Sequence, residues 1–67
     1  MARLSVIKKL RLEAGASQNQ LARKANLDRG TIASAENGGS PSELTRSKIA
    51  KALSDLLGRP VGIEDLT

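Results

Sequence analysis

Residues 17–38, SQNQLARKANLDRGTIASAENG, contain two short helical patterns separated by a turn. Ser17 followed by Gln20 has the form of a capping box, in which each side chain bonds the backbone N–H of the other residue, so a helix is predicted to begin here. Asn26 follows the apolar positions of that helix, and asparagine is one of the few non-glycine residues that accept a positive φ. Asp28 is the next N-cap candidate. The stretch therefore predicts two helices joined by a tight turn.

The second of these helices, predicted over residues 29–37, carries short side chains on its outward face. If Ile32 points inward, the outward positions are Arg29, Gly30, Ala33 and Ser34, with Thr31 beside them. Because side chains this short enclose little core, the face suits the close approach of another surface. That surface is either a second helix of the protein or an external partner.

The chain on either side of this stretch also has the spacing of helices. Residues 6–14 carry apolar side chains at helical intervals, and Gly15 stands where a left-handed cap would end them. Residues 40–43, SPSE, predict a further helix start, with Ser40 as the N-cap, the proline at the first helical position and the glutamate closing a capping box. That helix is expected to continue to Gly58.

A short last helix is expected at residues 63–66. No segment alternates apolar and polar residues, and the predicted loops are short, so a sheet is excluded. The sequence therefore predicts an all-α protein, a compact bundle of five short helices that forms a single domain over residues 1–67.

Composition excludes several classes of site. The chain of 67 residues has no Cys and no His, so we expect no disulfide, no cysteine or histidine metal site and no cofactor. It also has no Phe, Trp or Tyr, which excludes the stacking of single-stranded bases on aromatic rings. The adjacent carboxylates Glu64 and Asp65 fit compensation of a helix dipole better than acid–base chemistry. We therefore expect neither an enzyme nor a small-molecule ligand.

The charge distribution favours a polyanionic partner. The formal net charge is +4 and the pI is about 10.1, which suits nucleic acid, although a solvated basic surface is the alternative. Most of the Lys and Arg residues lie within residues 1–35, where Glu13 and Asp28 are the acids. Neither a secretory signal nor a long apolar segment is present, so we expect a soluble cytoplasmic protein without a membrane partner.

Taken in order, the motifs resemble those of the phage-repressor and Cro-like helix-turn-helix proteins, also called the xenobiotic-response-element family. The matching elements are Leu10-Arg11, SQxxLA at residues 17–22, Leu27, Ile32, ENG at residues 36–38 and IAKAL at residues 49–53. The resemblance covers about residues 6–66. It implies a lambda-repressor-like DNA-binding domain whose helix-turn-helix is formed by the second and third helices.

Two charged residues of these motifs fall on faces that are predicted to point inward. Arg11 lies one turn beyond Ile7, and Glu36 lies one turn beyond Ile32. We therefore predict a buried or half-buried Arg11–Glu36 ion pair, which the family commonly forms. Removal of one partner from such a pair typically costs about 3–5 kcal/mol. Separate solvation of the two charges is the alternative.

The resemblance implies that the helix over residues 29–37 lies in the major groove of DNA and reads base edges. The expected base-contacting residues are Arg29, Gly30, Thr31, Ala33 and Ser34, with Arg29 directed at guanine O6 and N7. The expected phosphate-contacting residues are Ser17, Gln18, Arg23, Lys24, Asn37, Ser40, Arg46 and Lys48. In similar proteins the glutamine at position 18 grips the DNA backbone; a solvated glutamine beside a simple cap is the alternative.

The sequence departs from the family pattern at two places. Many members carry long side chains where Gly30, Ala33 and Ser34 stand, so DNA shape and dimer spacing are expected to add to specificity. Arg46 and Ser47 occupy positions that are usually apolar, and Leu44 is expected to compensate for them.

These observations predict a sequence-specific regulator of transcription that binds double-stranded DNA, a repressor that occupies a palindromic operator as a homodimer. A DNA-binding antitoxin, or a phage or plasmid regulator with a protein partner, is the first alternative, and a helical protein-interaction module is the second. The apolar residues near the C-terminus either form the dimer interface or close the monomer core; they are Leu56, Leu57, Val61, Ile63 and Leu66. The expected location is the nucleoid of a prokaryotic cell or a phage-infected host.

Overall fold

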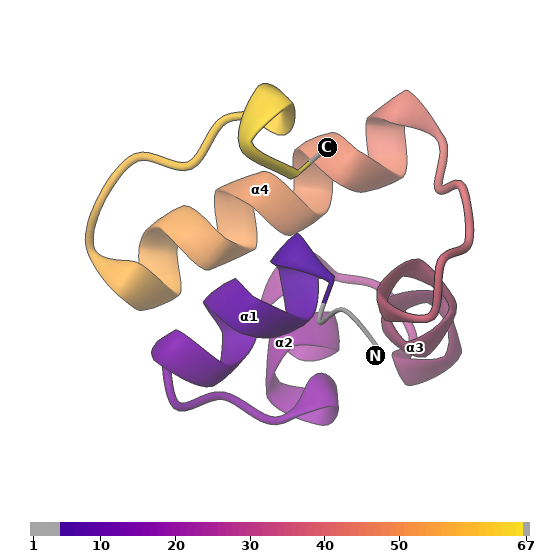
Figure 1. The fold of residues 1–67 in the computed structure, drawn as a ribbon. Helices are drawn as coiled ribbons and strands as arrows, with labels where there is room; N and C mark the ends of the chain where they lie inside the picture. Colours follow the sequence, from indigo (N-terminus) through magenta and orange to yellow (C-terminus); the bar gives the residue numbers. More distant parts are fainter. Residues whose placement is uncertain (1–4, 67) are drawn as a thin grey trace.

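A computed structural model describes residues 5–66 as four α-helices followed by one 3-10 helix (Figure 1). The elements are α1 (Val6–Glu13), α2 (Gln18–Ala25), α3 (Arg29–Glu36), α4 (Glu43–Leu57) and η1 (Ile63–Leu66). The described residues contain no strand, which agrees with the all-α prediction. Within residues 5–66 there are four α-helices rather than the five helices predicted, because the last predicted helix, at residues 63–66, is a 3-10 helix.

The predicted signals around α2 form the expected turn. Ser17 Oγ accepts a hydrogen bond from Gln20 N at 3.1 Å, and Gln20 Oε1 accepts one from Ser17 N at 2.7 Å, which completes the capping box. Asn26 has a φ of 59°, as the tight turn requires. Asp28 occupies the N-cap of α3 but makes no capping bond to the backbone; its Oδ1 accepts a hydrogen bond from the Thr31 hydroxyl at 2.7 Å. α2 and α3 therefore form a helix-turn-helix.

The start of α4 differs from the prediction. Its N-cap is Ser42, and Ser40 and Pro41 lie in the preceding loop. Ser42 Oγ accepts a hydrogen bond from Thr45 N at 3.2 Å and donates one to the Thr45 hydroxyl at 3.0 Å. Either serine can cap a helix. Ser42 does so because the residue three positions on offers it two bonds.

The core consists of aliphatic residues contributed by all four α-helices. The fully buried side chains are Leu21, Ile32, Ile49 and Leu53, and Ile7 is nearly as deeply buried. Figure 1 shows α4 crossing the domain, with η1 on one side and α1 and α2 on the other. The core is therefore enclosed between α4 on one side and α1 and the helix-turn-helix on the other.

The apolar residues near the C-terminus favour one of the two predicted roles. Leu56, Leu57, Val61 and Leu66 are half-buried and pack against the buried core. Ile63 is also half-buried. Closure of the monomer core therefore accounts for most of this apolar surface, and a dimer interface has less of it to use than the sequence suggests.

The first half of α4 contains a buried polar atom that the sequence did not predict. Leu44 does not compensate for Arg46, because it is 67% exposed. Arg46 is half-buried beside Ile7, Pro41 and Leu66. Its Nε atom is buried without a hydrogen-bond partner among the described residues. An arginine therefore stands at the edge of the core, where the family pattern favours an apolar side chain.

We expect Arg46→Met to raise the free energy of unfolding by about 1–3 kcal/mol, because a buried donor without a partner carries a desolvation cost of this size. Methionine fills similar space without a donor. Urea denaturation followed by circular dichroism measures the change. The control is Arg23→Met on the exposed surface of α2, which is expected to change stability by less than about 0.5 kcal/mol. An Arg46→Met variant less stable than the wild type would contradict this account.

Candidate nucleic-acid interface

The predicted ion pair forms between α1 and the last residue of α3. Arg11 Nε lies 2.6 Å from Glu36 Oε2, and Arg11 Nη2 donates to Glu36 Oε1 at 3.1 Å. Arg11 Nη1 also donates to the backbone oxygen of Ala16 at 2.9 Å. The two side chains are 9% and 2% exposed. The pair therefore joins α1, the chain before α2 and α3 in one buried cluster.

The cluster keeps Glu36 ionised. Burial raises the pKa of this carboxyl, but hydrogen bonds from Arg11 and Gln18 and the positive charges of Arg11 and Lys8 outweigh burial. The pKa of Glu36 therefore lies below its ordinary value of 4.5. Such a carboxylate binds protons less readily in the folded state than in the unfolded state. It therefore stabilises the fold at pH values above its ordinary pKa.

This lowered pKa predicts acid sensitivity that depends on Glu36. The stability contributed by its charge is complete above pH 4.5 and is lost as the pH falls through the lower folded pKa. We expect the wild type to exceed Glu36→Gln in free energy of unfolding by a constant amount near neutrality, and the difference to shrink as the pH falls below 4.5. Urea denaturation at several pH values measures the difference. The control is Glu43→Gln, at an exposed residue. A difference in free energy of unfolding between the wild type and Glu36→Gln that instead grows in acid would contradict the assignment.

Gln18 connects this cluster to the start of α3. Its Nε2 donates to Glu36 Oε1 at 3.1 Å, and its Oε1 accepts a long hydrogen bond from Arg29 Nε at 3.4 Å. The first residue of α2 and the first residue of α3 therefore lie next to each other on the surface. A helix N-terminus that can bind a phosphate is in this way placed beside the predicted base-reading arginine.

The outward face of α3 is open. Arg29, Gly30 and Ser34 are exposed, and Thr31 and Ala33 are half-buried. α3 packs on α1 and α2 with its opposite side, which carries Ile32, Ala35 and Glu36. Among the described residues, no helix covers the short side chains. Within residues 5–66, this face is therefore not closely packed against another helix, which was the alternative that the sequence left open.

The loop after α3 closes tightly against this face. Gly39 N donates to the backbone oxygen of Ser34 at 2.9 Å, and a Cβ atom added at Gly39 would lie 2.7 Å from that oxygen. Ser40 and Pro41 then line a hollow together with Gly30 and Ser34. Sequence patterns mark Gly39 as a helix breaker, but its close approach to Ser34 depends on the path of the folded loop.

The predicted phosphate-contacting residues fall into separate groups. Ser17 and Gln18 lie at the start of α2 beside Arg29, whereas Asn37 and Ser40 follow α3, so these four lie around the open face. Arg46 lines a neighbouring hollow, together with Ser40 and Pro41 of the loop after α3.

Lys24 and Lys48 form a second basic group, between α2 and α4. Lys51 lines the same hollow, together with the acidic residue Asp55. Lys51 was not predicted as a site residue. The signal that could have found it is its helical spacing of three residues from Lys48.

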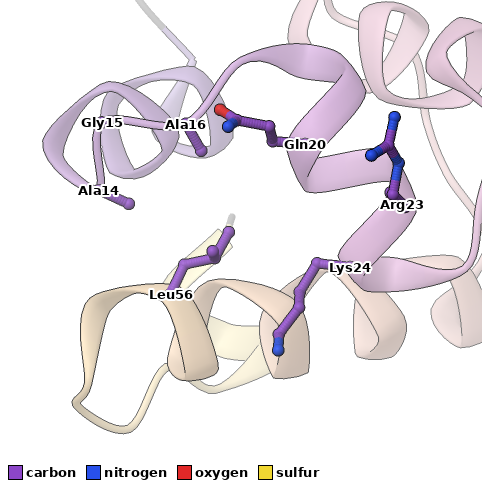
Figure 2. Close-up of a pocket in the computed structure, with 7 residues that line it drawn as sticks. All are labelled: Ala14, Gly15, Ala16, Gln20, Arg23, Lys24 and Leu56. Atoms are coloured by element: carbon purple, nitrogen blue, oxygen red, sulfur yellow. The ribbon is translucent and has the colours of Figure 1, made fainter.

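Arg23 belongs to the rim of a groove of about 420 Å³ (Figure 2). The other residues that line the groove are Ala14, Gly15, Ala16, Gln20, Lys24 and Leu56. In Figure 2, Lys24 extends towards α4, whereas Arg23 points away from Leu56. No residue of α3 lines the groove, so it is distinct from the open face of α3.

The geometry defines a helix-turn-helix domain: two short helices, a tight turn at Asn26 and an exposed second helix fixed to the rest of the fold by a buried ion pair. A helix-turn-helix family model matches residues 7–57, more than half of the 67 residues. The chain belongs to this family, that of the Cro/C1-type, or xenobiotic-response-element, helix-turn-helix proteins. At the level of the family it is a DNA-binding regulator of transcription.

The family is not typically enzymatic. No curated protein and no solved structure is significantly similar to this chain. Within residues 5–66, the helices are too short or too polar to cross a membrane.

Proposed function

We propose that this protein is a sequence-specific repressor that occupies its operator, with residues 1–67 acting as one DNA-binding domain. The observation that carries the proposal is the juxtaposition of Arg29, exposed at the start of α3, with the start of α2 through Gln18. One surface in this way offers a base-reading side chain and a helix N-terminus suited to phosphate. Such a protein would act on the nucleoid, in the cytoplasm of a prokaryotic cell or a phage-infected host.

Base recognition would come from the open face of α3. The short side chains of Gly30, Ala33 and Ser34 would let the helix backbone lie deep in the major groove. Arg29 would bind guanine through O6 and N7, and the methyl groups of Thr31 and Ala33 would contact thymine. Because few side chains read bases directly, DNA shape would contribute to specificity.

Phosphate binding would position the domain on either side of α3. The backbone N–H groups of Gln18 and Asn19 have no acceptor within residues 5–66, so they are available to a phosphate at the positive end of the α2 dipole. Ser17, Asn37 and Ser40 would add contacts beside them. Arg23, Lys24, Arg46 and Lys48 would contribute positive charge around the contact surface.

The proposed repressor is a homodimer on a palindromic operator. A single short reading helix contacts few base pairs, and two protomers on two half-sites double the number that are read. Dimer contacts would come from those parts of Leu56, Leu57, Val61, Ile63 and Leu66 that the core leaves uncovered. Repression would follow from occupancy, because a bound dimer excludes other proteins from the operator.

A second candidate function is that of an antitoxin, or a phage or plasmid regulator, which binds a protein partner as well as DNA. The groove in Figure 2 favours this candidate, because it combines an apolar floor with cationic residues away from the open face of α3. Co-purification of a second protein without loss of DNA binding would distinguish this candidate from the first.

Arg29→Ala tests the proposed reading face. Against a duplex selected from a random pool by the wild type, we expect the variant to bind about 5- to 150-fold more weakly, because a bidentate arginine–guanine contact is worth about 1–3 kcal/mol. Fluorescence anisotropy measures the affinity, and circular dichroism is expected to show unchanged helical content. The control is Arg59→Ala, an exposed arginine paired with Glu13 at 2.7 Å. Unchanged affinity in a folded Arg29→Ala variant would favour a protein-interaction module without a DNA role.

The salt dependence of binding tests the phosphate contacts. We expect the logarithm of the wild-type binding constant to fall linearly with the logarithm of salt concentration, because cations on the protein release counterions from DNA. Lys24→Ala and Lys48→Ala should each reduce the slope by about one and weaken binding to all duplexes alike. A wild-type affinity that does not change with salt would exclude a phosphate-based mechanism.

A further inference from the structure

The segment that follows α3 contains an asparagine followed by two glycines, Asn37-Gly38-Gly39. All three residues are exposed, and in Figure 1 the connection from α3 to α4 runs along the outside of the domain. Gly38 has a φ of 90°, and no atom beyond its two chain neighbours lies within 4 Å of the position that a Cβ would occupy. The backbone between Asn37 and Gly38 therefore lies in solvent, with room to change conformation.

This arrangement suits a known reaction of asparagine. The side-chain amide can be lost when the backbone nitrogen of the next residue attacks the side-chain carbonyl carbon. The attack needs a nitrogen that is not held in a hydrogen bond and a following residue that is not bulky. Gly38 meets both conditions, because it has no side chain and its N–H has no acceptor within residues 5–66. The Asn37 amide likewise makes no hydrogen bond to another described residue.

The other two asparagines of the chain, Asn19 and Asn26, do not meet these conditions. Asn19 precedes Gln20, whose N–H is bonded within the capping box of α2 at 3.1 Å. Asn26 precedes Leu27, a half-buried residue whose N–H donates to the backbone oxygen of Ala22 at 2.8 Å. In both cases the attacking nitrogen is occupied and carries a large side chain on its residue. The structure therefore separates the asparagine after α3 from the other two.

We propose that Asn37 is a site of spontaneous deamidation, and that the product weakens the binding of DNA. The modification itself depends only on the loop, whereas its effect on DNA rests on the proposed function. Among the described residues, the loop over residues 38–41 makes one backbone hydrogen bond to α3, from Gly39 N to the Ser34 oxygen at 2.9 Å. Because one exposed bond opens readily, the loop can bring Gly38 N to the Asn37 Cγ atom.

The reaction has two steps. In the first, Gly38 N gives up its proton and forms a bond to Asn37 Cγ, while the Cγ–Nδ2 bond breaks and the amide nitrogen leaves as ammonia. Water then opens the resulting cyclic imide. Attack at Cγ gives aspartate with the normal backbone, and attack at the backbone carbonyl carbon gives isoaspartate, in which the chain runs through Cγ. One water is consumed and one ammonia released, without an oxidant or a reductant.

Either product places a carboxylate at the C-terminal end of α3, where Asn37 is the C-cap. Negative charge is unfavourable at this end of a helix dipole, and it repels the phosphates that are proposed to lie beside the open face. Isoaspartate also lengthens the backbone before Gly39. The approach of Gly39 to α3 is close, since a Cβ there would lie 2.7 Å from the Ser34 oxygen. A longer backbone would therefore disturb the loop that borders the reading helix.

The experiment first follows deamidation of the purified protein at mildly alkaline pH, which favours loss of the proton from the backbone nitrogen. Cleavage after Lys and Arg separates the three asparagines, because residues 12–23, 25–29 and 30–46 form different peptides. Mass spectrometry detects the replacement of the amide NH₂ by OH. We expect the peptide of residues 30–46 to be deamidated at least several-fold faster than the other two.

The affinity for the selected duplex is measured on the same samples by fluorescence anisotropy. We expect the affinity to fall as the deamidated fraction grows. Asn37→Asp should bind about ten-fold more weakly than the fresh wild type, because a hydrogen bond to a charged group is worth about this factor. The matched control is Asn37→Gln, which keeps an amide but has a side chain one carbon longer, so that ring closure is slow. Its affinity should not change during the same incubation.

Circular dichroism reports whether each variant is folded; if Asn37→Gln is unfolded, Asn37→Ser, which has no amide, replaces it with the same expected result. Equal rates in the three peptides, or a slower rate in residues 30–46, would overturn the proposed site. Unchanged affinity in a fully deamidated sample would overturn the proposed effect on DNA. A fresh wild type that binds no duplex would instead refute the proposed function, and the comparison of peptides tests the modification independently of that result.

Discussion

The placement of α3 depends on the buried ion pair between Arg11 and Glu36. The core that surrounds the pair is small and entirely aliphatic, and a domain of this size has a net stability of only about 5–15 kcal/mol. An uncompensated charge left by the loss of one partner costs about 3–5 kcal/mol. Loss of either partner would therefore remove a large share of the stability of the domain. The pair lies at the end of α3 that is opposite the predicted contact of Arg29 with bases.

The same charges reach the surface through Gln18. Glu36 has two oxygens, and the one that accepts from Arg11 Nη2 also accepts from Gln18. The buried ion pair and the contact between Gln18 and Arg29 are in this way linked through one carboxylate. Arg46 presents the opposite case, because its buried Nε has no hydrogen-bond partner among the described residues.

Local signals in the sequence were sufficient for much of the architecture. The capping box of α2, the positive φ of Asn26 and the left-handed caps at Gly15 and Gly58 all depend on residues within one turn of each other. The ion pair could also be predicted, because helical spacing placed both charges on inward faces. The start of α4 was predicted two residues too early, because residues 40–43 have the form of a capping box with a proline at the first helical position. Ser42 caps the helix instead, through its bonds to Thr45, and local rules do not rank one cap above the other.

The sequence by itself determined an all-α chain, a helix-turn-helix over residues 17–38 and an outward face with short side chains on the second helix of that motif. These features follow from periodicity, capping and side-chain size, which act over a few residues. Tertiary structure alone decided that Leu44 is exposed while Arg46 is half-buried, that most C-terminal apolar residues close the core, and that Gln18 joins Glu36 to Arg29. Each of these depends on how helices distant in sequence pack together, and single-helix patterns do not contain that information.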